Sequence, residues 1–347
     1  MTMRHSSALL GLCVAIATMV LLSPALAQAQ ARGGEQWVVP RTSDGHPDLQ
    51  GNWTNQTITP MQRREGQDRI LTWDEVAERE GRVVERSQAG AEASDPDRPP
   101  LEAGSNVGAY NNVYFEFGQR VAIVNGEPLS SLITSPDNGR KPALTPEGER
   151  RRDEIREFRS QFGPSDNPEN RVLQDRCLVS FTNHGGPPMT PNYGYNSNYT
   201  IVQTADYVML HYEMVHDTRI IRLGEPDPLP AHMRPWFGDS WGVWEGNTLV
   251  VETTNIYPLQ DYMGIHPTPD LTVHERFTRV DDDTILYEFE IDDPRTYSEP
   301  WGGQIPWERF DQEILEYACH EGNYALSNIL SGARYQERQG GGNEPDA

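Results

Sequence analysis

Residues 199–222 read YTIVQTADYVMLHYEMVHDTRIIR. The run is rich in β-branched and aromatic residues, which is typical of a β-strand. Successive side chains of one strand point to opposite faces, so one face carries His211, Glu213, Asp217 and Arg219 among aliphatic neighbours. Charges beside aliphatic side chains suit neither a solvated face nor a dry core. The pattern therefore predicts a strand that lines a cavity.

The rest of the chain also favours strands. Between Asp281 and Asp283 three aspartates separate two strand-like segments, which indicates a hairpin. No helix of useful length separates the later segments, so parallel βαβ units are disfavoured. We predict a mainly β, antiparallel fold, either barrel-like or a strongly curved sandwich, with a few short helices. The expected strands are 121–124, 130–134, 199–223, 248–254, 271–280, 284–291 and 307–317.

Three helices are expected. Thr72 with Glu75 three residues later forms the pattern of a capping box. Pro146 directly after Thr145 suits the first position of a helix. Its sparse apolar stripe predicts a helix that lies on the surface. A short helix, 323–333, is expected after the last strand.

The N-terminus predicts export. Basic residues precede the apolar stretch 8–22, and Ala25 and Ala27 supply the small residues of a cleavage site. We expect a signal peptide over 1–27 and a periplasmic or secreted protein with no membrane anchor. An N-terminal arm with one helix and a flexible loop is expected over 28–109. The β-rich core is then 110–335, and 336–347 is a disordered tail.

Charge and cysteines add further limits. The 347 residues include 52 acidic and 29 basic ones, which gives a net charge of −23. Such a surface argues against nucleic-acid partners and anionic membranes. In an exported chain Cys177 and Cys319 predict a disulfide. A catalytic thiol is the alternative, but no local signature surrounds either cysteine.

His211, Glu213 and His216 are spaced somewhat like the ligands of a metal site. Zinc ligands on a helix are four residues apart, whereas these histidines are five apart on an expected strand and point to opposite faces. A third ligand would have to come from elsewhere in space, namely from His184, His274 or His320. We therefore expect no cofactor, with a divalent metal as the less favoured alternative.

Acid–base chemistry suits the charged face better. Glu213 and His211 are the expected proton-transfer pair, and Asp217 with Arg219 the orienting pair. A structural ion-pair network is the alternative. The strand that ends at Cys319 places two more candidates near a helix start, and a disulfide would hold them still. These residues are His320 and Glu321, which we expect to close the site.

Substrate contacts are expected from an aromatic cluster. Trp241 and Trp244 lie near Asp239, and tryptophans beside a carboxylate suit sugar stacking. Tryptophans that plug a barrel end are the alternative. Glu252 on a neighbouring strand and Asn323 complete the expected binding residues. Helix capping is the alternative role for Asn323.

Several segments resemble a widespread family of exported bacterial proteins that carry no assigned activity. These are 42–53, 131–140, 212–219, 238–246 and 317–324. The resemblance spans nearly all of the chain beyond the signal peptide, and it implies export and a shared fold. The entry Gly51-Asn52-Trp53 also resembles the Gly-x-Trp entry of lipocalin-type (calycin) barrels.

These observations predict an exported enzyme of lyase, isomerase or cyclase type. It would use acid–base chemistry, without an organic cofactor, on a small organic or sugar-derived molecule held in the barrel. One alternative is a barrel protein that binds the same kind of ligand without turnover. The other is a glycan-active protein with a tryptophan platform.

Overall fold

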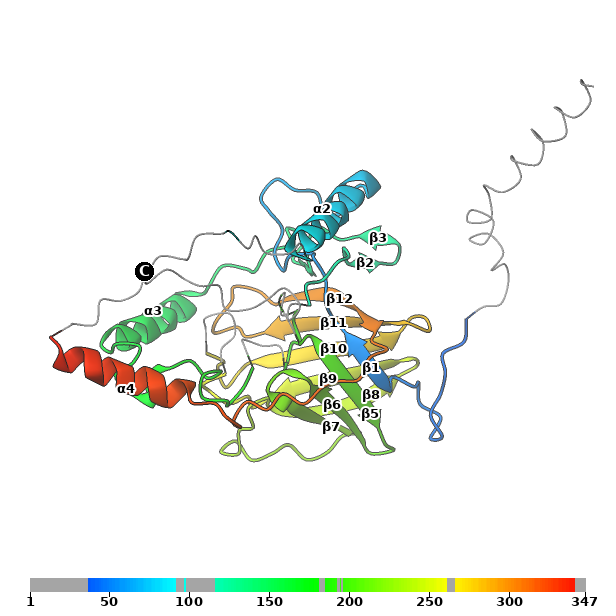
Figure 1. Cartoon of the computed structure of the whole chain (residues 1–347). Coiled ribbons are helices and arrows are strands. Elements are labelled where there is room, and N and C mark those ends of the chain that lie inside the picture. The colour runs from blue at the N-terminus through cyan, green and yellow to red at the C-terminus, as the bar shows by residue number, and fades with distance from the viewer. Residues whose placement is uncertain are drawn as a thin grey trace, which may run out of the picture. The chain divides into compact units, whose positions relative to one another are not determined.

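The structure is a computed structural model, and it describes residues 37–91, 97, 116–180, 185–191, 194, 196–260 and 266–340. Contacts separate the chain into a unit that ends at Val38 and a unit from Val39 onward, which holds every element below. The helices and strands, labelled as in Figure 1, are β1 (Gly51–Thr54), α2 (Trp73–Ala91), β2 (Ile123–Val124), β3 (Glu127–Pro128), β4 (Ile133–Ser135), α3 (Pro146–Ser160), η2 (Pro168–Asn170), β5 (Asn198–Gln203), β6 (Tyr207–Tyr212), η3 (Met214–His216), β7 (Thr218–Leu223), β8 (Asp239–Glu245), β9 (Thr248–Thr254), β10 (Thr272–Arg279), β11 (Thr284–Asp292), β12 (Trp301–Arg309) and α4 (Ala325–Arg338).

Within the described residues, nine strands close into a β-barrel. Their order is β1-β5-β6-β7-β8-β9-β10-β11-β12, and β1 pairs again with β12 to complete the circle. β4 is an extra strand on β12. The prediction of a mainly β, barrel-like fold is confirmed. The pairing is antiparallel except between β7 and β8, which run parallel because the 224–238 connection crosses over between them.

The Gly-x-Trp segment is the strand that closes the barrel. β1 pairs with β5 on one side and with β12 on the other. Trp53 is fully buried, and its indole N–H donates to the carbonyl of Leu49 at 2.9 Å. The guanidinium of Arg309 lies 4.9 Å from its ring centroid, and that of Arg279 lies 5.7 Å away. A segment expected in the arm therefore completes the wall.

The barrel interior is a packed core. Tyr199 stacks on Trp307 with 4.4 Å between ring centroids, and on Tyr212 with 4.9 Å. Phe277 and Trp301 add further fully buried rings. Closely packed aromatic side chains leave little room for a ligand. The ligand cavity predicted inside the barrel stays a prediction.

The prediction of one strand over 199–223 is wrong. The chain forms three antiparallel strands, β5, β6 and β7, with a turn at each joint. The second turn contains Val215 at φ +59° and His216 at φ +47°, both in the left-handed region. It is closed by the N–H of Tyr212, which donates to the carbonyl of Asp217 at 2.7 Å. The alternation of side chains between the two faces of the sheet is therefore interrupted at this turn.

The expected helices are present, with changed bounds at the C-terminus. The N–H of Thr72 donates to a Glu75 carboxylate oxygen, and the N–H of Glu75 donates to the Thr72 hydroxyl, as a capping box requires. The Thr145 hydroxyl accepts from the N–H of Gly148 at the start of α3. The last strand ends at Arg309 rather than at 317, and α4 extends beyond the expected 323–333.

The predicted disulfide is present. Cys177 and Cys319 are bonded, with 5.8 Å between their Cα atoms, so the loop after η2 is tied to the segment that leads to α4. No helix within the described part of the chain is both long and apolar enough to cross a membrane. The expected signal peptide, most of the flexible loop of the arm and residues 341–347 of the expected tail lie outside the described residues.

Candidate functional site

The four charged residues of the 199–222 run do not share one face. His211 lies on the outer side of β6, partly exposed, with Nδ1 3.0 Å from the Thr218 hydroxyl. Burial and then the neighbouring His216 lower the pKa of His211. Arg219 points into the barrel with 2 % of its side chain exposed. The turn described above causes this split, because it reverses the chain between His211 and Arg219.

Glu213 and Asp217 lie in that turn, and each accepts hydrogen bonds from other segments. Glu213 accepts from the side-chain amide of Asn198 at 2.8 Å and from the N–H of Leu315 at 3.3 Å. Asp217 accepts from the N–H of Ser180 at 3.0 Å. Burial raises the pKa of Asp217 to about 7. No hydrogen bond between described residues joins His211 to Glu213 as the expected proton-transfer pair.

Arg219 pairs with Glu275 rather than with Asp217. Its Nη1 lies 2.9 Å from Oε2 of Glu275, which is fully buried on β10. Tyr287 donates its hydroxyl to Glu275 at 2.8 Å and accepts from the N–H of Met189 at 2.9 Å. Burial, and then the charge of Glu275, raise the pKa of Tyr287 well above its usual range, so the phenol stays protonated.

Glu275 was not among the expected site residues, although the sequence holds a signal for it. On β10 the side chain of Glu275 points to the same face of the sheet as those of Val273 and Phe277, which are both fully buried. A carboxylate in that series must enter the core, where it needs a cation. The hydrogen bonds described above make this network a structural part of the barrel.

The C-terminal candidates lie on the surface. His320, Glu321 and Asn323 are all exposed. The Asn323 side chain accepts from the N–H of Ala325 at 3.0 Å and donates to the sulfur of Cys177 at 3.5 Å. Asn323 thus forms a turn that leads into α4, whose N-cap residue is Tyr324.

The expected substrate-binding residues on β8 and β9 are dispersed. Asp239 is buried and accepts from Arg222 at 2.7 Å and from the N–H of Leu229 at 2.7 Å. Trp244 is partly buried and stacks on His46 at 5.2 Å. Trp241 and Glu252 are paired in register and both partly exposed. None of the expected catalytic or binding residues lines the pockets described below.

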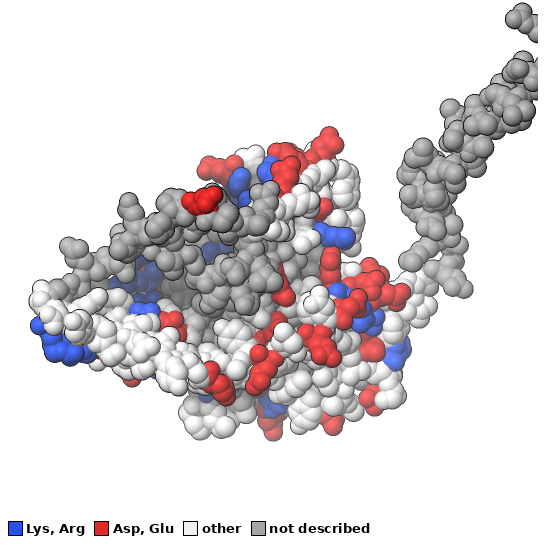
Figure 2. Space-filling view, viewed as in Figure 1, with Lys and Arg blue, Asp and Glu red and all other residues white. Residues whose placement is uncertain are grey.

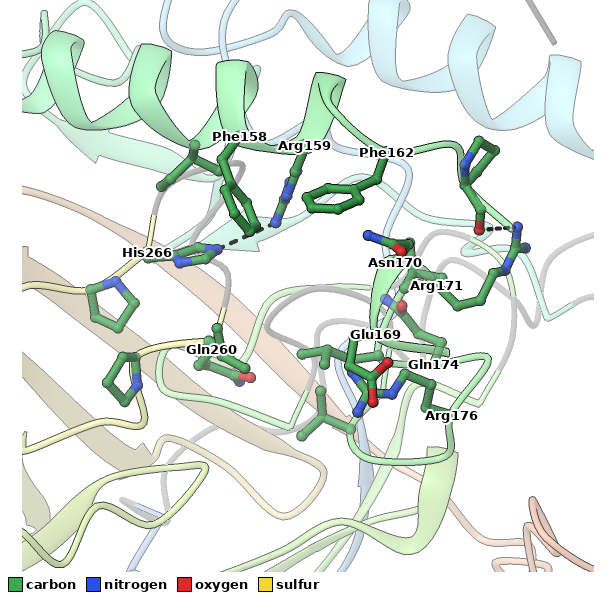
Figure 3. Close-up of a pocket in the computed structure, with 18 of the residues that line it drawn as sticks. Phe158, Arg159, Phe162, Glu169, Asn170, Arg171, Gln174, Arg176, Gln260 and His266 are labelled. Carbon is green, nitrogen blue, oxygen red and sulfur yellow. Dashed lines mark hydrogen bonds between the residues drawn. The ribbon is translucent and has the colours of Figure 1, made fainter. Parts of the chain in front are cut away.

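A pocket of about 1170 Å³ lies outside the barrel strands. One wall is a face of α3 and its C-terminal extension, the second is the 163–180 loop, and the third consists of residues 258–260 and 266–267 (Figure 3). The described residues that line it are Arg151, Glu154, Ile155, Phe158, Arg159, Phe162, Gly163, Pro164, Glu169, Asn170, Arg171, Val172, Leu173, Gln174, Arg176, Val179, Ser180, Pro258, Leu259, Gln260, His266 and Pro267.

The helix wall of this pocket is both aromatic and basic. Phe158 is 61 % exposed and Phe162 38 % exposed, and their rings meet edge to face at 5.3 Å. Side chains four residues apart lie on one face of a helix, which places Arg151, Ile155 and Arg159 beside them. The narrow apolar stripe of this surface helix therefore faces the pocket.

Four arginines against two glutamates give the lining an excess of positive charge. Arg171 is neutralised by Asp175 at 2.7 Å, and Arg151 donates to the carbonyl of His266 at 2.6 Å. Arg159 contacts only the imidazole of His266, at 3.3 Å, and Arg176 has no side-chain partner among the described residues. In Figure 2 the acidic side chains are spread over the barrel surface on the face shown. Two arginines thus retain hydrogen-bonding capacity toward a ligand.

The pocket reaches the end of the barrel through Ser180. This residue lines the pocket, and its N–H is the group that binds the carboxylate of Asp217. The disulfide holds the same wall, because Cys177 lies between the lining residues Arg176 and Val179. Asp217 therefore binds a residue of the pocket wall without lining the pocket itself.

A second pocket, of about 480 Å³, lies between β1, α2 and the start of β5. Asn198 lines it, and its amide donates both to Glu116 at 3.2 Å and to Glu213 at 2.8 Å. Glu213 is buried behind Asn198. The Glu213 carboxylate thus holds the side-chain amide of Asn198 in place, and Glu213 does not line this pocket.

No group of three or more His, Cys, Asp or Glu side chains in the described ranges is placed to hold a metal ion. His184, one of the alternative ligands, lies outside those ranges. Comparison of the chain with protein-family models, with curated proteins and with solved structures gave no match.

Proposed function

We propose that the protein binds a small amphipathic organic anion in the pocket between α3, the 163–180 loop and residues 258–260 with 266–267. The observation that carries this proposal is the pair of available arginines, Arg159 and Arg176, beside exposed phenylalanines in a chain of net charge −23. This is the ligand-binding alternative of the sequence, moved from the inside of the barrel to its outside.

Physical chemistry matches each wall to one part of such a ligand. Guanidinium groups bind carboxylates through paired, charge-assisted hydrogen bonds. Phe158 and Phe162 offer apolar surface that is now in contact with water, and a ligand would bury it at roughly 25 cal/mol per Å². The volume of about 1170 Å³ lies slightly above the range for small-molecule sites, roughly 300–1,000 Å³, so the pocket can hold a ligand of that size. An apolar body with a single acidic group fits both walls.

A second candidate function is acid–base turnover of the bound anion. It is favoured by Asp217, whose pKa of about 7 gives similar populations of its protonated and ionised forms at neutral pH. Groups that exchange protons in enzymes have pKa values near the working pH. The binding of its carboxylate by Ser180 brings this group next to the pocket. Incubating a panel of organic acids with wild type and Asp217→Asn, followed by mass spectrometry, tests this candidate. A product that forms with both proteins alike, or with neither, counts against it.

We further propose that the protein is exported with removal of residues 1–27. A disulfide between Cys177 and Cys319 supports this, because such bonds persist in oxidising compartments. N-terminal sequencing of the protein recovered from the periplasm or medium tests the cleavage near Ala27.

Fluorescence of 1-anilinonaphthalene-8-sulfonate, an amphipathic anion, tests binding. We expect 3-phenylpropionate to displace the dye and the neutral 3-phenylpropanamide to displace it poorly. Arg159→Gln and Arg176→Gln should each weaken the binding of 3-phenylpropionate about 10-fold, since one charge-assisted hydrogen bond contributes about 1.5 kcal/mol.

Arg156→Gln is the matched control. It removes an arginine that is exposed on the same helix as Arg159 and does not line the pocket. The affinity of this variant for 3-phenylpropionate should therefore equal that of wild type. Equal binding of the acid and the amide, or equal weakening by all three variants, would contradict the proposal.

A further inference from the structure

Gln260 is a buried amide at the pocket wall without a hydrogen-bonding partner. Its side chain is 1 % exposed, and neither Nε2 nor Oε1 has a partner among the described residues. The residue lines the pocket, and Figure 3 shows it across from Glu169 and Gln174.

The backbone fixes Gln260 in this place. Its N–H donates to the carbonyl of Tyr257 at 3.0 Å, and the N–H of Tyr257 donates to the carbonyl of Pro235 at 3.0 Å. The amide is thus held at the wall by a turn anchored to a second segment. Folded proteins rarely leave a buried amide unpaired, because its desolvation is not compensated. The position is therefore suited to a ligand that supplies the missing partner.

A carboxamide offers one acceptor and two donors, so its best complement carries both an acceptor and a donor. A carboxylate has only acceptors and leaves Oε1 of Gln260 unpaired. An amide of the ligand satisfies both atoms of Gln260. The ligand's charge then belongs to the arginine wall, and its apolar group belongs to the phenylalanine wall.

We infer that the anion bound in this pocket carries an amide, as in an N-acylated apolar amino acid or the C-terminal end of a short peptide. This rests on the proposed function, and it deepens that function by naming the ligand class. Its carboxylate would bind Arg159 or Arg176, its apolar side chain would cover Phe158 and Phe162, and its amide would pair with Gln260.

Three carboxylates separate the inference from the proposed function. They are N-acetyl-L-phenylalanine, its ester analogue O-acetyl-L-3-phenyllactate, and 3-phenylpropionate, and their affinities are measured by calorimetry with the full chain. Wild type should bind the amide about 10-fold more tightly than the ester, because the ester lacks the N–H donor. Gln260→Met keeps the side-chain shape and should reduce this preference to below 2-fold, with the affinity for 3-phenylpropionate unchanged.

Each outcome decides one of the two proposals. If wild type binds amide and ester equally, or if Gln260→Met retains the preference, the inference is overturned while the anion site stands. If none of the three carboxylates binds, the proposed function fails and takes the inference with it. The comparison of amide with ester on wild type decides the question even if Gln260→Met does not fold.

Discussion

Arg219 and Glu275 form an ion pair across the inside of the barrel, with 2.9 Å between Nη1 and Oε2. They come from β7 and β10, which are separated by two strands in the sheet. Because both side chains are shielded from water, each charge depends on the other for compensation. The pair thus links two walls of the barrel that share no backbone hydrogen bonds.

Removing one member of this pair should destabilise the protein strongly. We expect Arg219→Met to lower the free energy of unfolding by about 3–5 kcal/mol, since it leaves the buried Glu275 carboxylate without the cation that pairs with it. The double variant with Glu275→Met should lose clearly less than the sum of the two single variants. Urea denaturation of the four proteins measures this, and additive losses would show that the two charges are independent.

The stability of the protein should fall as pH rises through the titration of Asp217. Its pKa is raised from 3.8 to about 7 in the folded protein, so the folded state holds its proton more strongly. The stabilisation is complete below about pH 4 and is lost by about pH 7, and its upper limit is roughly 4 kcal/mol. Asp217→Asn should therefore gain stability relative to wild type between pH 4.5 and pH 8. Asp206→Asn, at an exposed turn, is the control and should follow wild type.

Loss of the disulfide should cost stability through the unfolded state. The two cysteines are 142 residues apart, and closing a loop of that length stabilises a fold by about 5 kcal/mol on chain entropy. We expect the Cys177→Ser, Cys319→Ser double variant to unfold at lower urea concentration than oxidised wild type. Wild type treated with a reductant should match the variant. Coincident unfolding curves for all three would show that the bond adds no stability.

Replacing Gln260 with an apolar residue should stabilise the protein without ligand. Gln260→Met removes two buried polar atoms that lack partners, which is worth about 1 kcal/mol. A higher melting temperature is the expected result. The control Gln161→Met changes an exposed glutamine after α3 and should stay within about 0.5 kcal/mol of wild type. A lower melting temperature for Gln260→Met would mean that its amide has a structural role.

Sequence signals of short range proved sufficient for much of the barrel. The three aspartates at 281–283 do join two antiparallel strands, β10 and β11. The capping pairs at Thr72 and Thr145 do begin helices. In these cases the residues that specify the structure are close together in the chain, so a local pattern contains the information.

The turn of residues 213–217 could not be predicted in this way. It contains no glycine, proline or asparagine, and its left-handed positions are occupied by Val215 and His216. A left-handed β-branched residue costs about 1–2 kcal/mol locally, and contacts made elsewhere in the fold must offset that cost. Since a residue on a strand alternates faces only while the strand continues, this one missed turn moved His211 away from Arg219.

The pocket also could not be predicted from the alternation of residues along the strands. Its walls are a helix with the loop that follows it and residues 258–260 and 266–267 from a second part of the chain, and no alternation connects them. The available signal was the stripe of Ile155, Phe158 and Phe162 flanked by arginines, whose role depends on what lies opposite the helix. Loop and helix positions become a site only through the tertiary fold.

The pairing of β1 sets the order of events in folding. Its four residues emerge early in synthesis, yet their partners Tyr199 and Arg309 follow about 150 and 250 residues later. Contacts of such long range form slowly, because loop closure must precede them. Until β12 has left the ribosome, a sheet that runs from β1 to β11 therefore keeps two open edges, those of β1 and β11. Edges of this kind recruit other strands, so the interval before closure is when the chain has most need of a chaperone.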